Sequence, residues 1–340
     1  MAIIKPPKSG YIQPWTRIIF HRIPVNPVLL GVCIATLLFV LFFVGRLIFD
    51  GGRGSTPGDF RLTIIHILLV AYAASAYVYL LDAVTKTASD MAPVVSHSLQ
   101  WRAVADRVGS HLWWGLLLAG LLGIGIDIYA TNTTTTGSDP WDWQQTNYDS
   151  RWMRILGPMF SWWIACLLYV LIIESARLSR LSGSIDNIDL MDLSPYQPLI
   201  RQGLTNALLV VGLASVLSLF LFEPGFMTLM IQLTSIFAVV AWIGLILPLR
   251  GIRRKIAEAK TRELDWCKAA VKTAIEQLKS GDKSGKSLAE LVAYRNLIEN
   301  TRSWPFDNPT LTRFALYLLI PLGSMLGGAL VERGLDLILP

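Results

Sequence analysis

Long apolar runs separated by short polar segments dominate the hydrophobic pattern of this 340-residue chain. A helix needs about 20 mostly apolar residues to cross the hydrocarbon core of a bilayer, which is about 30 Å thick. Seven runs reach or approach that length and predict seven transmembrane helices, with six as the alternative if the last run lies in the membrane interface. They are residues 28–49, 62–81, 112–130, 153–173, 205–222, 226–249 and 311–331. The pattern therefore predicts an all-α, polytopic integral membrane protein.

The longest polar interruption covers residues 250–310. In its first half, apolar side chains such as Ile256, Ala259 and Cys267 recur at helical spacing. In its second half, Ser287 and Glu290 have the spacing of a capping box, which starts a helix. We therefore predict that the sixth span continues as a rod over 251–279 and that a second helix returns to the membrane. The predicted units are an N-terminal segment (1–27), a six-helix bundle (28–249), a helical hairpin (250–310) and a last span with the C-terminus (311–340).

Composition and charge agree with this layout. Hydrophobic residues make up 53% of the chain and charged residues 16%, whereas soluble domains carry about 25% charged residues. If the N-terminus is cytoplasmic, 24 of the 30 Lys and Arg residues lie on the cytoplasmic side and 6 lie outside. For an inner or plasma membrane, the positive-inside rule then predicts a cytoplasmic N-terminus and a C-terminus outside, and an organelle membrane would give the same pattern. The net charge of +6 is explained by this bias, so no nucleic-acid partner is predicted.

The sequence offers little catalytic chemistry. Its three cysteines lie far apart, and no His, Cys, Asp or Glu spacing is typical of a metal site, so we predict no metal and no cofactor. His66, Asp127 and Glu174 fall near the ends of predicted spans, and His111 has no evident partner. Because paired carboxylates for acid–base work are not grouped anywhere, we do not expect an enzyme.

Two polar or small-residue surfaces are candidates for a path through the membrane. In the sixth span, polar residues at i, i+4 and i+7 share one helical face, and small residues cluster beside a proline in the last span. Small residues also let membrane helices pack closely, so ordinary packing remains the alternative. The residues of the candidate path are Thr228, Gln232, Ser235, Pro321, Gly323, Ser324, Gly327 and Gly328.

Four basic residues stand where the sixth span is predicted to leave the membrane. They are Arg250, Arg253, Arg254 and Lys255. Such a cluster fixes topology under the positive-inside rule, and it is also a candidate contact for anionic lipid.

The predicted hairpin has an apolar stripe too narrow for an independent core at about 50 residues. It therefore needs a partner, for which a second copy of the chain is the leading hypothesis. That hypothesis predicts a homo-oligomeric channel or channel-like conduit assembled through the hairpin. One alternative is a non-conducting scaffold or signalling subunit that presents residues 251–303 to a cytoplasmic protein. A second alternative is a secondary transporter.

Overall fold

The structure is a computed structural model that describes residues 11–12, 26–49, 57–95, 107–134, 148–183, 185, 188–222, 227–280 and 288–301, with five positions between 312 and 323. These residues form an all-α fold, apart from the two-residue strands β1 (Tyr11–Ile12) and β2 (His111–Leu112), which pair antiparallel. The helices are α2 (Pro27–Phe49), α3 (Pro57–Val95), α5 (Trp113–Thr134), α6 (Tyr148–Gly183), α7 (Gln197–Leu217), α8 (Met227–Ile246), α9 (Arg250–Ser280) and α10 (Leu288–Asn300). Three short 3-10 helices, η1 (Ser194–Tyr196), η2 (Ser218–Phe222) and η3 (Leu247–Leu249), lie at helix junctions.

Five described helices are long and apolar enough to cross a membrane. They are Pro27–Phe49, Phe60–Val94, Tyr148–Gly183, Ser194–Phe220 and Gln232–Gln277, and the apolar helix Trp113–Tyr129 is shorter. The prediction of an all-α chain with several helices able to span a bilayer is thereby confirmed. The seventh predicted span lies outside the described residues except for a few positions.

Helices α3 and α6 form the centre of the bundle. They pack along each other, while α5 covers α6, α2 covers α3, and α7 packs between α3 and α8. The core between them is made of fully buried aliphatic side chains, among them Leu69, Leu80, Leu167 and Leu213. Side chains of α2 remain mostly exposed, as expected for a helix that faces lipid.

The central helices are longer than the apolar runs that predict them. Helix α3 continues to Val95, beyond the predicted end at residue 81, and α6 continues to Gly183. Polar residues interrupt the apolar run, but Val84, Ala88 and Met91 keep a buried stripe at i, i+4 and i+7. We call the end of the bundle where α3 and α6 stop and α9 begins the hairpin end.

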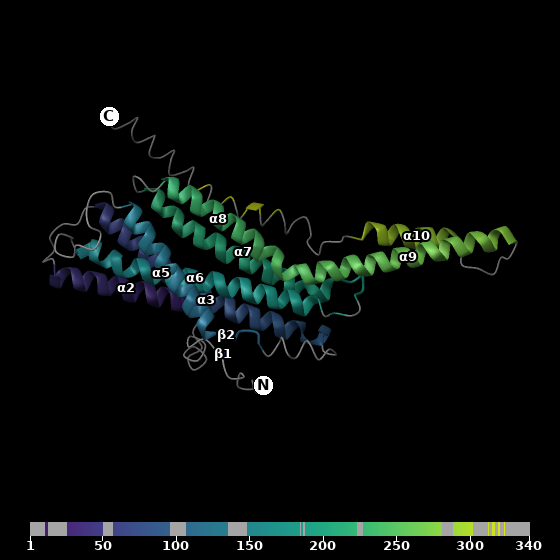
Figure 1. Cartoon of the computed structure of the whole chain (residues 1–340), viewed down its shortest axis with the longest axis horizontal. Coiled ribbons are helices and arrows are strands. Elements are labelled where there is room, and N and C mark those ends of the chain that lie inside the picture. The colour runs from purple at the N-terminus through teal and green to yellow at the C-terminus, as the bar shows by residue number, and fades with distance from the viewer. Residues whose placement is uncertain are drawn as a thin grey trace, which may run out of the picture.

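The hairpin is an outward extension of α8. Helix α8 passes through η3 directly into α9, and α9 then projects beyond the bundle with α10 packed along it (Figure 1). Helix α9 has 31 residues and is therefore about 46 Å long, at 1.5 Å per residue. The helix predicted over 251–279 is thus observed as α9, followed by a second helix, α10.

The base of α9 is fixed against α6. A Cβ atom at Gly251 would overlap the backbone carbonyl of Ser179 and the hydroxyl of Ser182, so only glycine permits this approach. Farther along, Lys260 Nζ donates to the carbonyl oxygens of Glu299 at 2.7 Å and Thr301 at 2.9 Å, at the end of α10. The two hairpin helices are thus tied to each other and to the bundle.

Candidate functional site

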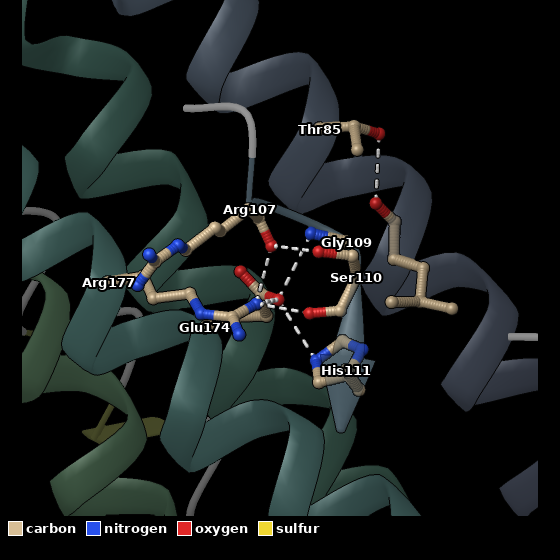
Figure 2. Close-up of polar contacts among 8 residues, drawn as sticks. Thr85, Arg107, Gly109, Ser110, His111, Glu174 and Arg177 are labelled. Atoms are coloured by element: carbon tan, nitrogen blue, oxygen red, sulfur yellow. Dashed lines mark hydrogen bonds and ion pairs between the residues drawn. The ribbon is translucent and has the colours of Figure 1, made fainter. Parts of the chain in front are cut away.

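A buried carboxylate lies near the hairpin end of α6. The Glu174 side chain is fully buried, and its Oε1 accepts a hydrogen bond from Arg177 Nη1 at 2.6 Å. The same oxygen accepts from the Gly109 backbone N–H at 3.1 Å, and His111 Nε2 lies 2.9 Å away. Figure 2 shows the carboxylate held between α6 and the segment that leads into β2. We call Gly109, His111, Glu174 and Arg177 the Glu174 cluster.

The segment 107–112 is shaped to reach this carboxylate. Gly109 has a φ of 74°, the one positive φ among the described residues, and this conformation costs glycine less than other residues. Arg177 Nη1 also donates to the carbonyl oxygens of Arg107 and Ser110, both at 2.7 Å. A single guanidinium therefore joins α6 to the turn before α5.

Three buried polar atoms of the Glu174 cluster keep no hydrogen-bond partner among the described residues. They are Glu174 Oε2, His111 Nδ1 and His111 Nε2. His111 Nε2 is at ion-pair distance from Glu174, but its orientation does not meet the geometry of a hydrogen bond. The sequence alone gives His111 no evident partner, because His111 and Glu174 are far apart along the chain. Its partner is a carboxylate far along the chain.

A second polar group, the Asn206 network, lies beside the first. Thr87 Oγ1 on α3 donates to Gln202 Oε1 at 3.0 Å, and Gln202 Nε2 donates to Asn206 Oδ1 at 2.8 Å. Asn206 Nδ2 then donates to Ser175 Oγ at 2.9 Å and to the Gly244 carbonyl oxygen at 3.3 Å. These side chains are all buried, so hydrogen bonds connect α3, α6, α7 and α8 inside an apolar bundle.

The two polar groups meet on α6, where Glu174 and Ser175 are neighbours. Buried polar side chains are costly unless they are paired, and satisfied networks make the packing of their helices specific. The hairpin end of the bundle is therefore fixed by polar contacts as well as by apolar packing. Helix α9 packs against the same end of α6, where Gly251 approaches Ser179 and Ser182.

The structure places the candidate path residues only in part. Gln232 and Ser235 lie exposed on α8. Thr228 belongs to α8, but its side chain lies outside the described residues, as do Pro321, Ser324, Gly327 and Gly328. Gly323 is helical, and a Cβ atom there would meet nothing within 4 Å. The described part of the structure does not bring the two candidate surfaces together.

The basic cluster at the start of α9 is open to the surroundings. Arg250, Arg253 and Arg254 are exposed and Lys255 is half-buried. Arg254 Nε lies 3.3 Å from Glu258 Oε1, in an exposed i,i+4 pair. This arrangement is compatible with both sequence interpretations, topology and lipid contact.

A pocket opens at the side of the hairpin. It is a cavity of about 420 Å³ between residues 188–191, α9 and α10, and its walls include Asp189, Arg262, Glu263, Trp266 and Tyr294. Tyr294 Oη donates to Glu263 Oε2 at 3.3 Å. We call this cavity the hairpin pocket.

The negative charge around the hairpin pocket affects the pKa of Tyr294. Burial raises the pKa of Tyr294, and the nearby carboxylate of Glu263 raises it further, with a smaller effect from Asp189. The carboxylates of Glu263 and Asp189 therefore both lie near the Tyr294 hydroxyl. Glu263 is on α9, and Asp189 is in the connection between α6 and η1.

These sites contain features that sequence reasoning missed. Gln202 and Asn206 stand four residues apart on one helix face, which is a recognisable signal, but Gln202 lies before the predicted fifth span.

Within the described residues, no group of three or more His, Cys, Asp and Glu side chains is placed to hold a metal ion. No protein-family model, curated protein or solved structure matches this chain.

Proposed function

We propose that this chain is a multi-pass membrane protein, without catalytic activity of its own, that holds the α9–α10 hairpin in the cytoplasm as a fixed docking platform for another protein. The observation that carries this proposal is that the hairpin continues from the bundle without a break in the chain of helices. Helix α8 runs through η3 into α9, and the base of α9 packs on α6 at Gly251.

Exposed apolar side chains on the hairpin support the platform. Trp266, Ile275, Val292 and Leu297 are each between 40% and 51% exposed. Outside the bilayer, covering such side chains with a partner stabilises the complex by roughly 25 cal/mol per Å² of apolar surface buried. The narrow apolar stripe of the hairpin predicts that it needs a partner, and these residues are where that partner would bind.

The cytoplasmic location rests on the distribution of charge. Residues 250–310 hold 13 of the 30 Lys and Arg residues. Under the positive-inside rule, short segments rich in Lys and Arg stay on the cytoplasmic side. The bundle would then lie in an inner or plasma membrane.

Site-specific photo-crosslinking in living cells tests this proposal. A photoreactive residue at Val292, exposed on α10, is expected to form an adduct with a different cytoplasmic protein. The matched control is Leu122, which is 68% exposed on the apolar helix α5 and should give no protein adduct. Adducts of Val292 only with a second copy of the chain, or no adduct at all, would reject the platform.

A homo-oligomeric channel is the second candidate. It is favoured by the exposure of Gln232 on α8, because a polar side chain on a membrane-facing surface is costly unless another helix covers it. This candidate predicts an oligomer in detergent and a conductance after reconstitution. A monodisperse monomer would reject it.

A further inference from the structure

The hairpin pocket has the size and walls of a binding site. Its volume of about 420 Å³ lies within the range of about 300–1,000 Å³ typical of ligand pockets. Three separate parts of the chain line it: the connection between α6 and η1, helix α9 and helix α10. An adjoining hollow extends it past Glu290 and Leu291 on α10.

Two aromatic rings stand edge to face in this pocket. The centroids of Trp266 and Tyr294 are 6.0 Å apart and their planes cross at 88°. Trp266 is 48% exposed, so part of its indole can still be covered by a ligand. The face of an aromatic ring, and of tryptophan above all, attracts a cation.

The charge of the pocket is opposite to that of the hairpin around it. Its walls and the adjoining hollow carry three carboxylates, Asp189, Glu263 and Glu290, against one cation, Arg262. Residues 250–310 as a whole carry 13 basic and 8 acidic residues. The pocket therefore carries an excess of negative charge within a basic segment.

The carboxylates are held in place by neutral donors. Glu263 accepts from the Tyr294 hydroxyl, and Asp189 Oδ1 accepts from the Met191 backbone N–H at 2.8 Å. Because these donors are neutral, they do not offset the negative charges of Glu263 and Asp189. Arg262, Asp189 and Glu290 are all exposed, so solvent screens their charges, whereas Glu263 is half-buried and its charge is screened less.

We infer that the hairpin pocket binds the cationic side chain of a lysine or arginine presented by the partner protein, with its charge against Trp266, Tyr294 and Glu263. This inference rests on the proposed platform and names the chemistry of its partner. The aliphatic stem of such a side chain would lie on the apolar wall formed by Ala259 and Ile298.

A binding experiment on the full-length protein tests this inference. The protein is labelled with 5-fluorotryptophan and held in neutral detergent, which removes anionic lipid as a competitor. The probes are a capped Gly-Arg-Gly peptide and the same peptide with uncharged citrulline in place of arginine. The ¹⁹F resonance of Trp266, assigned with Trp266→Phe, is expected to shift saturably with the arginine peptide and at least about 5-fold more weakly with citrulline.

A matched pair of variants locates the interaction. Glu263→Gln is expected to weaken binding of the arginine peptide by roughly 3- to 10-fold, the change in Kd for about 0.7–1.4 kcal/mol. Glu276→Gln makes the same change on an exposed position of α9 outside the pocket and should leave Kd unchanged. Equal binding of the two peptides, equal effects of the two variants, or no saturable shift at millimolar peptide would overturn the inference.

The outcomes separate this inference from the proposed platform. If the Val292 adduct forms but the arginine peptide does not bind, the pocket inference fails and the platform stands. If the peptide binds and no adduct forms, the pocket stands as a cation site and the platform fails.

Discussion

The Glu174–Arg177 pair is a strong test of how the hairpin end is held together. Glu174→Leu removes the acceptor of two hydrogen bonds, from Arg177 at 2.6 Å and from Gly109 at 3.1 Å. It also leaves Arg177, whose side chain is only 13% exposed, without its counter-charge. Breaking a buried pair in this way costs about 3–5 kcal/mol.

A double-mutant cycle isolates the contribution of the pair. Arg177→Met removes the cation, so Glu174→Leu should cost less in that background, with an expected coupling free energy of about 2 kcal/mol. Stability is measured by SDS titration in mixed micelles, followed by the fluorescence of the 12 tryptophans.

The hairpin itself supplies a matched control for this cycle. Asp265 and Lys268 form a pair with the same i,i+3 spacing, at 3.3 Å, but both side chains are about two-thirds exposed. Surface pairs of this kind contribute at most about 1 kcal/mol, and often nothing. A coupling for Glu174 and Arg177 no larger than that of the control pair would refute the argument that burial makes the Glu174 cluster a structural anchor.

Four further predictions test neighbouring parts of the account. Asn206→Ala removes three hydrogen bonds, each worth about 0.6 kcal/mol between membrane helices, and should lower the free energy of unfolding in the same SDS titration by about 2 kcal/mol. Gly251→Leu places atoms against the α6 backbone, so overpacking should cost about 1–3 kcal/mol and increase protease cleavage within α9. Gly109→Ala is expected to cost about 1 kcal/mol in a thermal scan because φ is 74°, while Gly109→Asn should cost less. In a Cys33→Ser background, Glu276→Cys should react with a membrane-impermeant maleimide only after the cells are opened, and reaction with intact cells would reverse the proposed orientation.

Most of the helices are predictable because an apolar run alone determines a segment long enough to span a bilayer, as in the five long apolar helices. The hairpin is predictable for a similar reason, because its signals are local in the sequence. They are the helical spacing of Ile256, Ala259 and Cys267 and the capping-box spacing of Ser287 and Glu290. The extension of α3 was missed because hydropathy falls after residue 81. The buried stripe of Val84, Ala88 and Met91 continues within a polar sequence.

The Glu174 cluster could not be predicted for a different reason. Its members Gly109 and Glu174 are 65 residues apart, and only the packing of α6 against the turn before β2 brings them together. Sequence position alone placed Glu174 at a helix end, where a solvated carboxylate is equally reasonable. The hairpin pocket is likewise tertiary, because Asp189 reaches Tyr294 from a connection that precedes α7.

An electron spin-echo distance measurement shows whether the hairpin is held in one orientation on the bundle. Spin labels are attached at Arg201→Cys on α7 and Lys272→Cys on α9, both exposed positions, in a Cys33→Ser background in bicelles. The account predicts one narrow distance distribution that broadens when Gly251→Leu is added. A broad or multimodal distribution in the otherwise unchanged protein would contradict it.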